Sequence, residues 1–218
     1  MGTLTLLGFG LLLGIKHASD PDHVVAVAAI AGRYKRVWPA ALVGALWGLG
    51  HCLTIGVVGG LIIAFNLTVP PRVGLALEFV VGIALTVVGV LNLMGRGGFL
   101  TSSVERGELP KGKAFLLGLV HGLAGSAAVA LLVLATVKDP KDAFLYLIVF
   151  GVGTLMGMML ITIAFASPIV AMADRFKWSG DALRIVTGLF SAAFGLYVMY
   201  QIGVVDGLFG AHPKWTPV

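Results

Sequence analysis

The chain has 218 residues, of which 58% are hydrophobic and only 11% are charged, and its mean hydropathy is +1.01. A soluble globular domain carries about 25% charged residues, so this composition excludes a soluble enzyme and a disordered chain. A single cysteine, Cys52, excludes a disulfide scaffold. The net charge of +5 does not indicate nucleic acid as a partner, because the basic residues lie in short loops between apolar segments. We therefore expect the lipid bilayer to surround the chain.

Six apolar segments each reach the roughly 20 residues that a helix needs to cross a bilayer. They cover residues 3–31, 38–65, 73–94, 113–137, 143–170 and 181–203. The first segment continues well past signal-peptide length without a cleavage motif, so no cleavable signal is expected. The sequence predicts an all-α integral membrane protein with six transmembrane helices.

The basic residues predict the orientation of these helices. The loops 32–37, 95–113 and 171–184 together hold ten lysines and arginines, whereas the opposite side holds four. Because cytoplasmic loops carry an excess of positive charge, we place these three loops in the cytoplasm. This predicts a multi-pass protein of the inner (plasma) membrane with both termini outside.

The two halves of the chain resemble each other. The sequence LLGIKH at 12–17 aligns with LLGLVH at 116–121, and LEFVVG at 77–82 aligns with LRIVTG at 183–188. Three spans per half is an odd number, so the second half must enter the membrane from the opposite side. This is the inverted repeat of many secondary transporters, whose substrate sites lie near the midplane between repeats. The expected units are a first three-helix repeat (1–94), a cytoplasmic connecting loop (95–112), a second three-helix repeat (113–204) and a polar tail (205–218).

The middle of the first span contains polar residues that lipid should exclude. They are Lys16, His17, Ser19, Asp20, Asp22 and His23. An Asp or Lys at a helix centre costs about 2.5–3.5 kcal/mol on insertion scales, and such residues usually mark ion or proton pathways. The other three of the five histidines are His51, His121 and His212, and only His212 lies outside the spans.

The order His17-x4-Asp22-His23 requires a broken helix if these side chains are to share one ion. On a straight helix at about 100° per residue they would point at roughly 0°, 140° and 240°. Pro21 disrupts the helix before it, and Ser19 or Asp20 can cap a new helix that starts at the proline. In the second half, His121 precedes Gly122, Gly125 and Ser126. We therefore predict that the first and fourth helices are both broken.

Imidazole and carboxylate groups form a borderline ligand set that suits nickel, cobalt, zinc or copper, whereas magnesium and calcium prefer oxygen. We predict a metal site made of His17, Asp22 and His23, with His51 and His121 as further ligands. A packing network remains the alternative for each of these residues, above all for His51 and His121. Possible supporting residues around the ligands are Lys16, Asp20, Cys52, Thr54 and Ser126. Asp20 can equally be a helix cap, and Cys52 and Thr54 can equally be small residues at a helix interface.

The segment HASDPDH at 17–23 resembles the His-x4-Asp-His signature of the nickel/cobalt transporter (NiCoT/NicO) superfamily, in which a basic residue such as Lys16 commonly precedes the first histidine. LGHCLT at 49–54 similarly resembles the next motif of that superfamily. The resemblance covers the first two spans closely and the rest loosely. Members commonly have about eight spans and a second acidic motif, whereas six spans are expected here, so the chain is more similar to the shorter, urease-accessory-type nickel permeases.

Together these features predict a transporter of a divalent transition-metal ion, nickel(II) or cobalt(II), that works by uptake and alternating access and is not an enzyme. No prosthetic group is expected. The alternatives are a proton-coupled metal exporter of the same superfamily and a haem-binding membrane electron carrier with His51 and His121 as axial ligands. A homo-oligomer or a metallochaperone is a possible partner.

Overall fold

The computed structural model describes residues 3–31, 34, 36–65, 67, 69–95, 111–122, 137, 139–173 and 180–215. Within these ranges every regular element is helical. The helices are α1 (Thr3–Ala18), α2 (Pro21–Ala31), α3 (Val37–Phe65), α4 (Pro71–Leu93), α6 (Lys111–His121), α8 (Pro140–Ala173), α9 (Gly180–Tyr200) and the π-helical turn η2 (Gln201–Val205). Three of them, α2, α4 and α8, begin on a proline, because a first helical residue needs no amide donor and proline already has the helical φ.

Four helices in the described part of the chain are long and apolar enough to cross a membrane. They cover Val37–Phe65, Pro71–Leu93, Pro140–Ala171 and Ala182–Val205. The chain is therefore a helical membrane protein, and these four segments coincide with four of the predicted spans. The predicted span 3–31 consists of two shorter helices, α1 and α2. The predicted span 113–137 is described only as far as residue 122, so the break expected after His121 lies outside the described residues.

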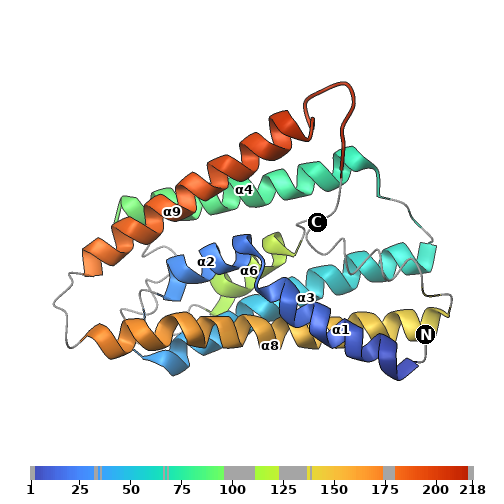
Figure 1. Cartoon of the computed structure of the whole chain (residues 1–218), viewed down its shortest axis with the longest axis horizontal. Coiled ribbons are helices and arrows are strands. Elements are labelled where there is room, and N and C mark those ends of the chain that lie inside the picture. Colours follow the sequence, from blue (N-terminus) through green and yellow to red (C-terminus); the bar gives the residue numbers. More distant parts are fainter. Residues whose placement is uncertain are drawn as a thin grey trace.

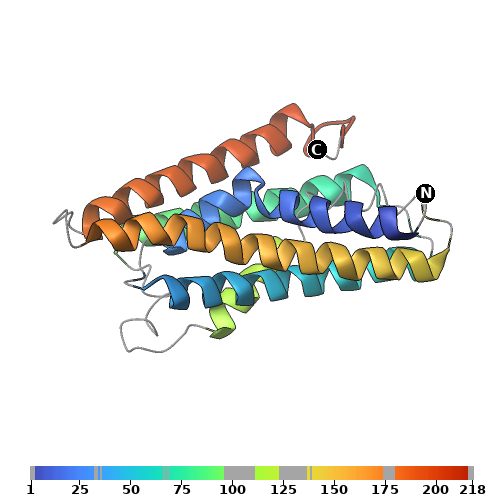
Figure 2. The same ribbon diagram turned by 60° about the horizontal axis from the view of Figure 1, so that its bottom comes forward.

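The helices form two groups with the short helices between them. Figure 1 shows α4 and α9 side by side, and α1, α3 and α8 as a second group, with α2 and α6 near the centre of the molecule. The view in Figure 2 shows α1 lying along α8. The most extensive contacts join α4 with α9, α1 with α8, α3 with α8, and α3 with α6. Helices that pack against each other are therefore mostly distant in sequence.

Glycines permit these close contacts and reveal the helix directions. Along α1 and α8 the contacting positions rise together, from Gly10 against Tyr146 to Ala18 against Gly157, so these helices run parallel. Helices α3 and α6 also run parallel, because Gly118 of α6 meets Trp47 and Gly122, the residue after α6, meets Thr54. Small residues let helix backbones approach within a membrane, where no hydrophobic force drives association.

The other two interfaces are antiparallel. Gly44 lies against Thr162 whereas Gly60 lies against Phe144, which sets α3 antiparallel to α8. On α4 and α9, Gly82 faces Gly195 and Gly89 faces Gly188. Because α1 is parallel to α8, α6 is parallel to α3, and α3 is antiparallel to α8, helices α1 and α6 run in opposite directions.

The C-terminal segment packs on the N-terminal half of α4. The Trp215 indole N–H donates to Glu78 Oε1 at 2.9 Å, and its ring covers Gly74. The Arg72 guanidinium donates to the carbonyl of Gly210 at 2.9 Å. Most of the segment that the sequence predicts as a polar tail is thus attached to the helix bundle.

Candidate metal centre

The histidines of the first predicted span meet because the helix stops and restarts between them. Helix α1 ends at Ala18 and α2 begins at Pro21. The amide of Asp20 donates to the carbonyl of His17, and the carbonyl of Asp20 accepts the amides of His23 and Val24 at 3.0 and 3.1 Å. The break therefore keeps its backbone hydrogen-bonded, and it brings the His17 and His23 rings to a centroid distance of 4.7 Å.

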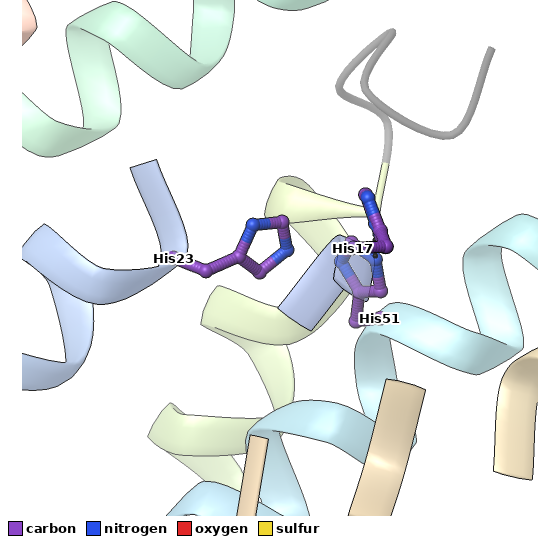
Figure 3. A group of neighbouring side chains, drawn as sticks. All are labelled: His17, His23 and His51. Atoms are coloured by element: carbon purple, nitrogen blue, oxygen red, sulfur yellow. Dashed lines mark hydrogen bonds between the residues drawn. The ribbon is translucent and has the colours of Figure 1, made fainter. Parts of the chain in front are cut away.

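A first group of ligand-type side chains consists of His17, His23 and His51. Nε2 of His17 lies 2.9 Å from Nε2 of His51. The His23 ring, from α2, lies 4.9 Å from the His51 ring. Figure 3 shows the His23 ring extending from its helix toward the other two. The ligand atoms of these three residues lie within 4.8 Å of one another, which fits a single bound ion.

A second group consists of Asp22, His23 and His121, whose ligand atoms also lie within 4.8 Å of one another. Asp22 uses its two carboxylate oxygens on different partners. Oδ1 lies 3.0 Å from Nδ1 of His23, and Oδ2 lies 3.0 Å from Nε2 of His121. The five predicted ligands thus form two groups that share His23.

The four histidines of the centre are buried, whereas the Asp22 side chain is 17% exposed. His23 and His51 are fully buried, and His17 and His121 are 5% and 1% exposed. Nε2 of His23 and Nδ1 of His51 have no hydrogen-bond partner among the described residues. A buried nitrogen without a partner costs about 1–3 kcal/mol. Because Nδ1 of His23 faces the Asp22 carboxylate and donates its proton there, Nε2 of His23 carries a lone pair that a metal ion can accept.

The proposed supporting residues take different places. Asp20 Oδ2 lies 2.9 Å from Nδ1 of His17, an arrangement that orients a ligating imidazole. The Lys16 side chain is exposed. Cys52 Sγ donates to the carbonyl of Gly151, and the Thr54 hydroxyl donates to that of Leu119, so both bond across helix interfaces. Ser126 lies outside the described residues.

Two aromatic residues that the sequence did not single out flank the histidines. The Trp47 ring lies 5.3 Å from the His121 ring and 5.7 Å from the His23 ring. Phe150 of α8 lies 5.6 Å from His17. Trp47 precedes His51 by one helical turn, a spacing that could have indicated it. Phe150 is too distant in sequence for any local signal.

The search of known proteins finds a relative along almost the whole chain. The chain is 36% identical over 218 residues to the urease accessory protein UreH of Bacillus sp. (strain TB-90), covering 94% of this chain and 95% of the relative. The chain belongs to the UreH family. UreH is named as an accessory protein, in agreement with the prediction that this UreH-family chain is not an enzyme.

More distant similarity connects the UreH-family chain with two plant proteins. It is 28% identical to each of the chloroplast proteins FOR GROWTH AND FERTILITY 1 and 2 of Arabidopsis thaliana. The aligned regions cover 91% and 90% of this chain but only 60% and 56% of the plant proteins. No protein-family model and no solved structure matches the chain.

Proposed function

We propose that this UreH-family protein is a membrane permease of the nickel/cobalt transporter superfamily that takes up a divalent transition-metal ion through the histidine centre. The observation that supports this most directly is the convergence of four buried histidines and the partly exposed Asp22, from four helices, into one cluster. Ionisable residues within membrane segments are costly, and a function is the usual reason for retaining them.

The ligand chemistry supports nickel or cobalt as the cargo. Imidazole nitrogens and one carboxylate are borderline ligands, so the cluster suits Ni²⁺, Co²⁺, Zn²⁺ or Cu²⁺ better than Mg²⁺ or Ca²⁺. The similarity to a urease accessory protein supports nickel among these. The ion is the transported substrate, which must be bound tightly enough to lose water and loosely enough to leave.

The helix contacts support two inverted three-helix repeats. Gly14 of α1 lies against Phe150 of α8, and its repeat equivalent Gly118 of α6 lies against Trp47 of α3. All three pairs of equivalent helices run antiparallel: α1 with α6, α3 with α8, and α4 with α9. An inverted repeat allows the two halves to exchange conformations and to expose a central site to each side in turn. The six-span topology of this proposal requires that the fourth span continues beyond residue 122.

Membrane potential supports uptake. Moving one charge through 100 mV is worth about 2.3 kcal/mol, so a dication entering a negative-inside cell gains about twice that without a coupled ion. Export would have to work against this gradient and would require coupling, for example to protons.

The geometry does not favour a haem carrier. Haem ligation by His51 and His121 would require the porphyrin to lie between their rings. The His23 ring lies 4.9 Å from the one and 4.6 Å from the other, so an imidazole already fills that space.

Flux measurements in proteoliposomes test the proposal. Vesicles with an inside-negative potential should accumulate Ni²⁺ or Co²⁺, and His17→Ala and Asp22→Asn should reduce the rate by at least about tenfold. His212→Ala is the matched control, because His212 is exposed in the C-terminal segment, outside the cluster. Transport by both site variants at the control rate would refute the site. Metal movement only against an imposed proton gradient would favour the exporter.

A further inference from the structure

His23 belongs to both ligand groups: its Nδ1 lies 3.0 Å from Asp22 Oδ1, and its ring extends toward His17 and His51 (Figure 3). We propose that the transported ion occupies two successive positions, one formed by His17, His23 and His51 and the other by Asp22, His23 and His121. The ion passes between these positions by changing its partner nitrogen on His23. This inference rests on the proposed transport function.

The chemistry of imidazole separates the two positions. The two ring nitrogens are chemically distinct and point away from each other, so one ion cannot bind both at once. Nδ1 of His23 lies 3.0 Å from Oδ1 of Asp22. Nε2 of His23 is buried and has no hydrogen-bond partner within the described ranges. A single ion held by all five side chains would need His23 to face both ways.

Distances between the outer ligands lead to the same conclusion. The His23 ring lies within 4.9 Å of the rings of His17, His51 and His121. The rings of His51 and His121 are 6.1 Å apart, farther from each other than either is from His23. His23 is therefore the central group of the cluster, and each outer pair reaches it from its own direction.

Charge prevents both positions from filling together. Two dications this close repel with four times the energy of two unit charges, and the buried surroundings screen that repulsion poorly. The cluster therefore holds one ion at a time. The positions also differ in charge, since three neutral imidazoles form the first and a carboxylate belongs to the second. An ion that moves from the first position to the second therefore gains a negatively charged ligand.

Only the second position includes a ligand from the second half of the chain, His121, whereas the other four ligands come from the first half. His17 and His121 occupy equivalent places in the repeat, and each packs on an aromatic ring of the opposite half, Phe150 and Trp47 respectively. A movement of one half against the other changes the distance between His121 and His23, while His17, His23 and His51 move together. Such a movement would transfer the ion between the positions.

Equilibrium binding of Co²⁺ to the detergent-solubilised full chain distinguishes two positions from one. We expect at least one of His17→Asn and His121→Asn to weaken binding by no more than about twofold, because an ion that loses the weaker of two positions retains the stronger one. The double variant should weaken binding by more than about 100-fold. One shared site predicts instead at least about tenfold for each single variant, with effects that multiply in the double variant.

Transport and stability complete the test. Each single variant should bind Co²⁺ but lose most of its flux in vesicles, because the ion reaches one position and cannot proceed. His212→Asn should match the wild type in both assays, and melting temperatures of all variants show whether they fold. Should Asn at either position prevent folding, Gln replaces it, with the same expectations. Multiplying effects on binding, or single variants with wild-type flux, would overturn the two positions while leaving the permease intact. A wild-type protein that neither binds nor moves metal would overturn the permease itself.

Discussion

The contact between α6 and α3 gives a quantitative prediction, because Gly118 of α6 lies directly on the backbone of α3. A Cβ added at Gly118 would overlap the carbonyl oxygen of Trp47 and lie 3.0 Å from the amide nitrogen of His51. These are backbone atoms, so no side-chain rotation relieves the collision and the helices must separate. We therefore expect Gly118→Ala to destabilise the protein and to displace His121, which follows by less than one turn.

The magnitude follows from two opposing terms. Inserting a methyl group into a tight core costs about 1–3 kcal/mol, and a backbone collision belongs to the upper part of that range. Replacing a helical glycine with alanine returns about 0.5–1 kcal/mol. The net loss is about 1–2 kcal/mol. At roughly 2–4 °C per kcal/mol for a chain of this size, the melting temperature should fall by about 2–8 °C.

Thermal unfolding in detergent micelles, followed by nickel flux in vesicles, checks this prediction. The control is Gly112→Ala in the same helix, where an added Cβ meets nothing within 4 Å. That variant should melt at or slightly above the wild-type temperature and transport normally. If Gly118→Ala also melts at or above the wild-type temperature, α6 and α3 do not pack as described.

Three further changes test other parts of the structure. Trp47→Phe should retain metal binding. Trp47→Ala should cost about 3–5 kcal/mol of stability and weaken Co²⁺ binding. Equal Co²⁺ binding by both variants would contradict a role for the aromatic ring. Trp215→Phe removes the hydrogen bond to Glu78 and should lower stability by about 1 kcal/mol without changing metal affinity, and a change in affinity would contradict this separation. Tyr34 lies in the loop before α3, and burial raises the pKa of its phenol to about 12. The folded protein therefore keeps the phenol neutral above the ordinary pKa of about 10. Its contribution to stability decreases as the pH rises from about 10 through 12. Tyr34→Phe should abolish this decrease in unfolding measurements between pH 9 and 12, and an unchanged profile would assign it to another group.

Most of the fold could be predicted because membrane helices carry a strong compositional signal. The predicted segments 38–65 and 73–94 lie almost residue for residue on α3 and α4. The predicted segment 143–170 is shorter than α8, which begins at Pro140. Lys141 and Asp142 are too polar for a hydropathy window, but they suit the first turn of a helix outside lipid.

The arrangement of the candidate ligands was predictable only in part. His17, Asp22 and His23 are close in sequence, and Pro21 indicated the break that lets them meet. The contact of His121 with Asp22 spans almost a hundred residues, and Phe150 reaches His17 from the opposite half of the chain. No local pattern contains such information, because it depends on which turns of α3, α6 and α8 lie at the same level.

The sequence by itself determined that this protein lies in a membrane. It also identified the polar residues within the apolar spans, which the bilayer disfavours. Both conclusions depend on transfer energies of single residues, which act wherever the chain folds. Only the tertiary structure decided that those residues form two groups around His23 instead of one ring around an ion. That arrangement depends on glycine-mediated approach between helices from different halves, and on the direction in which a buried imidazole faces.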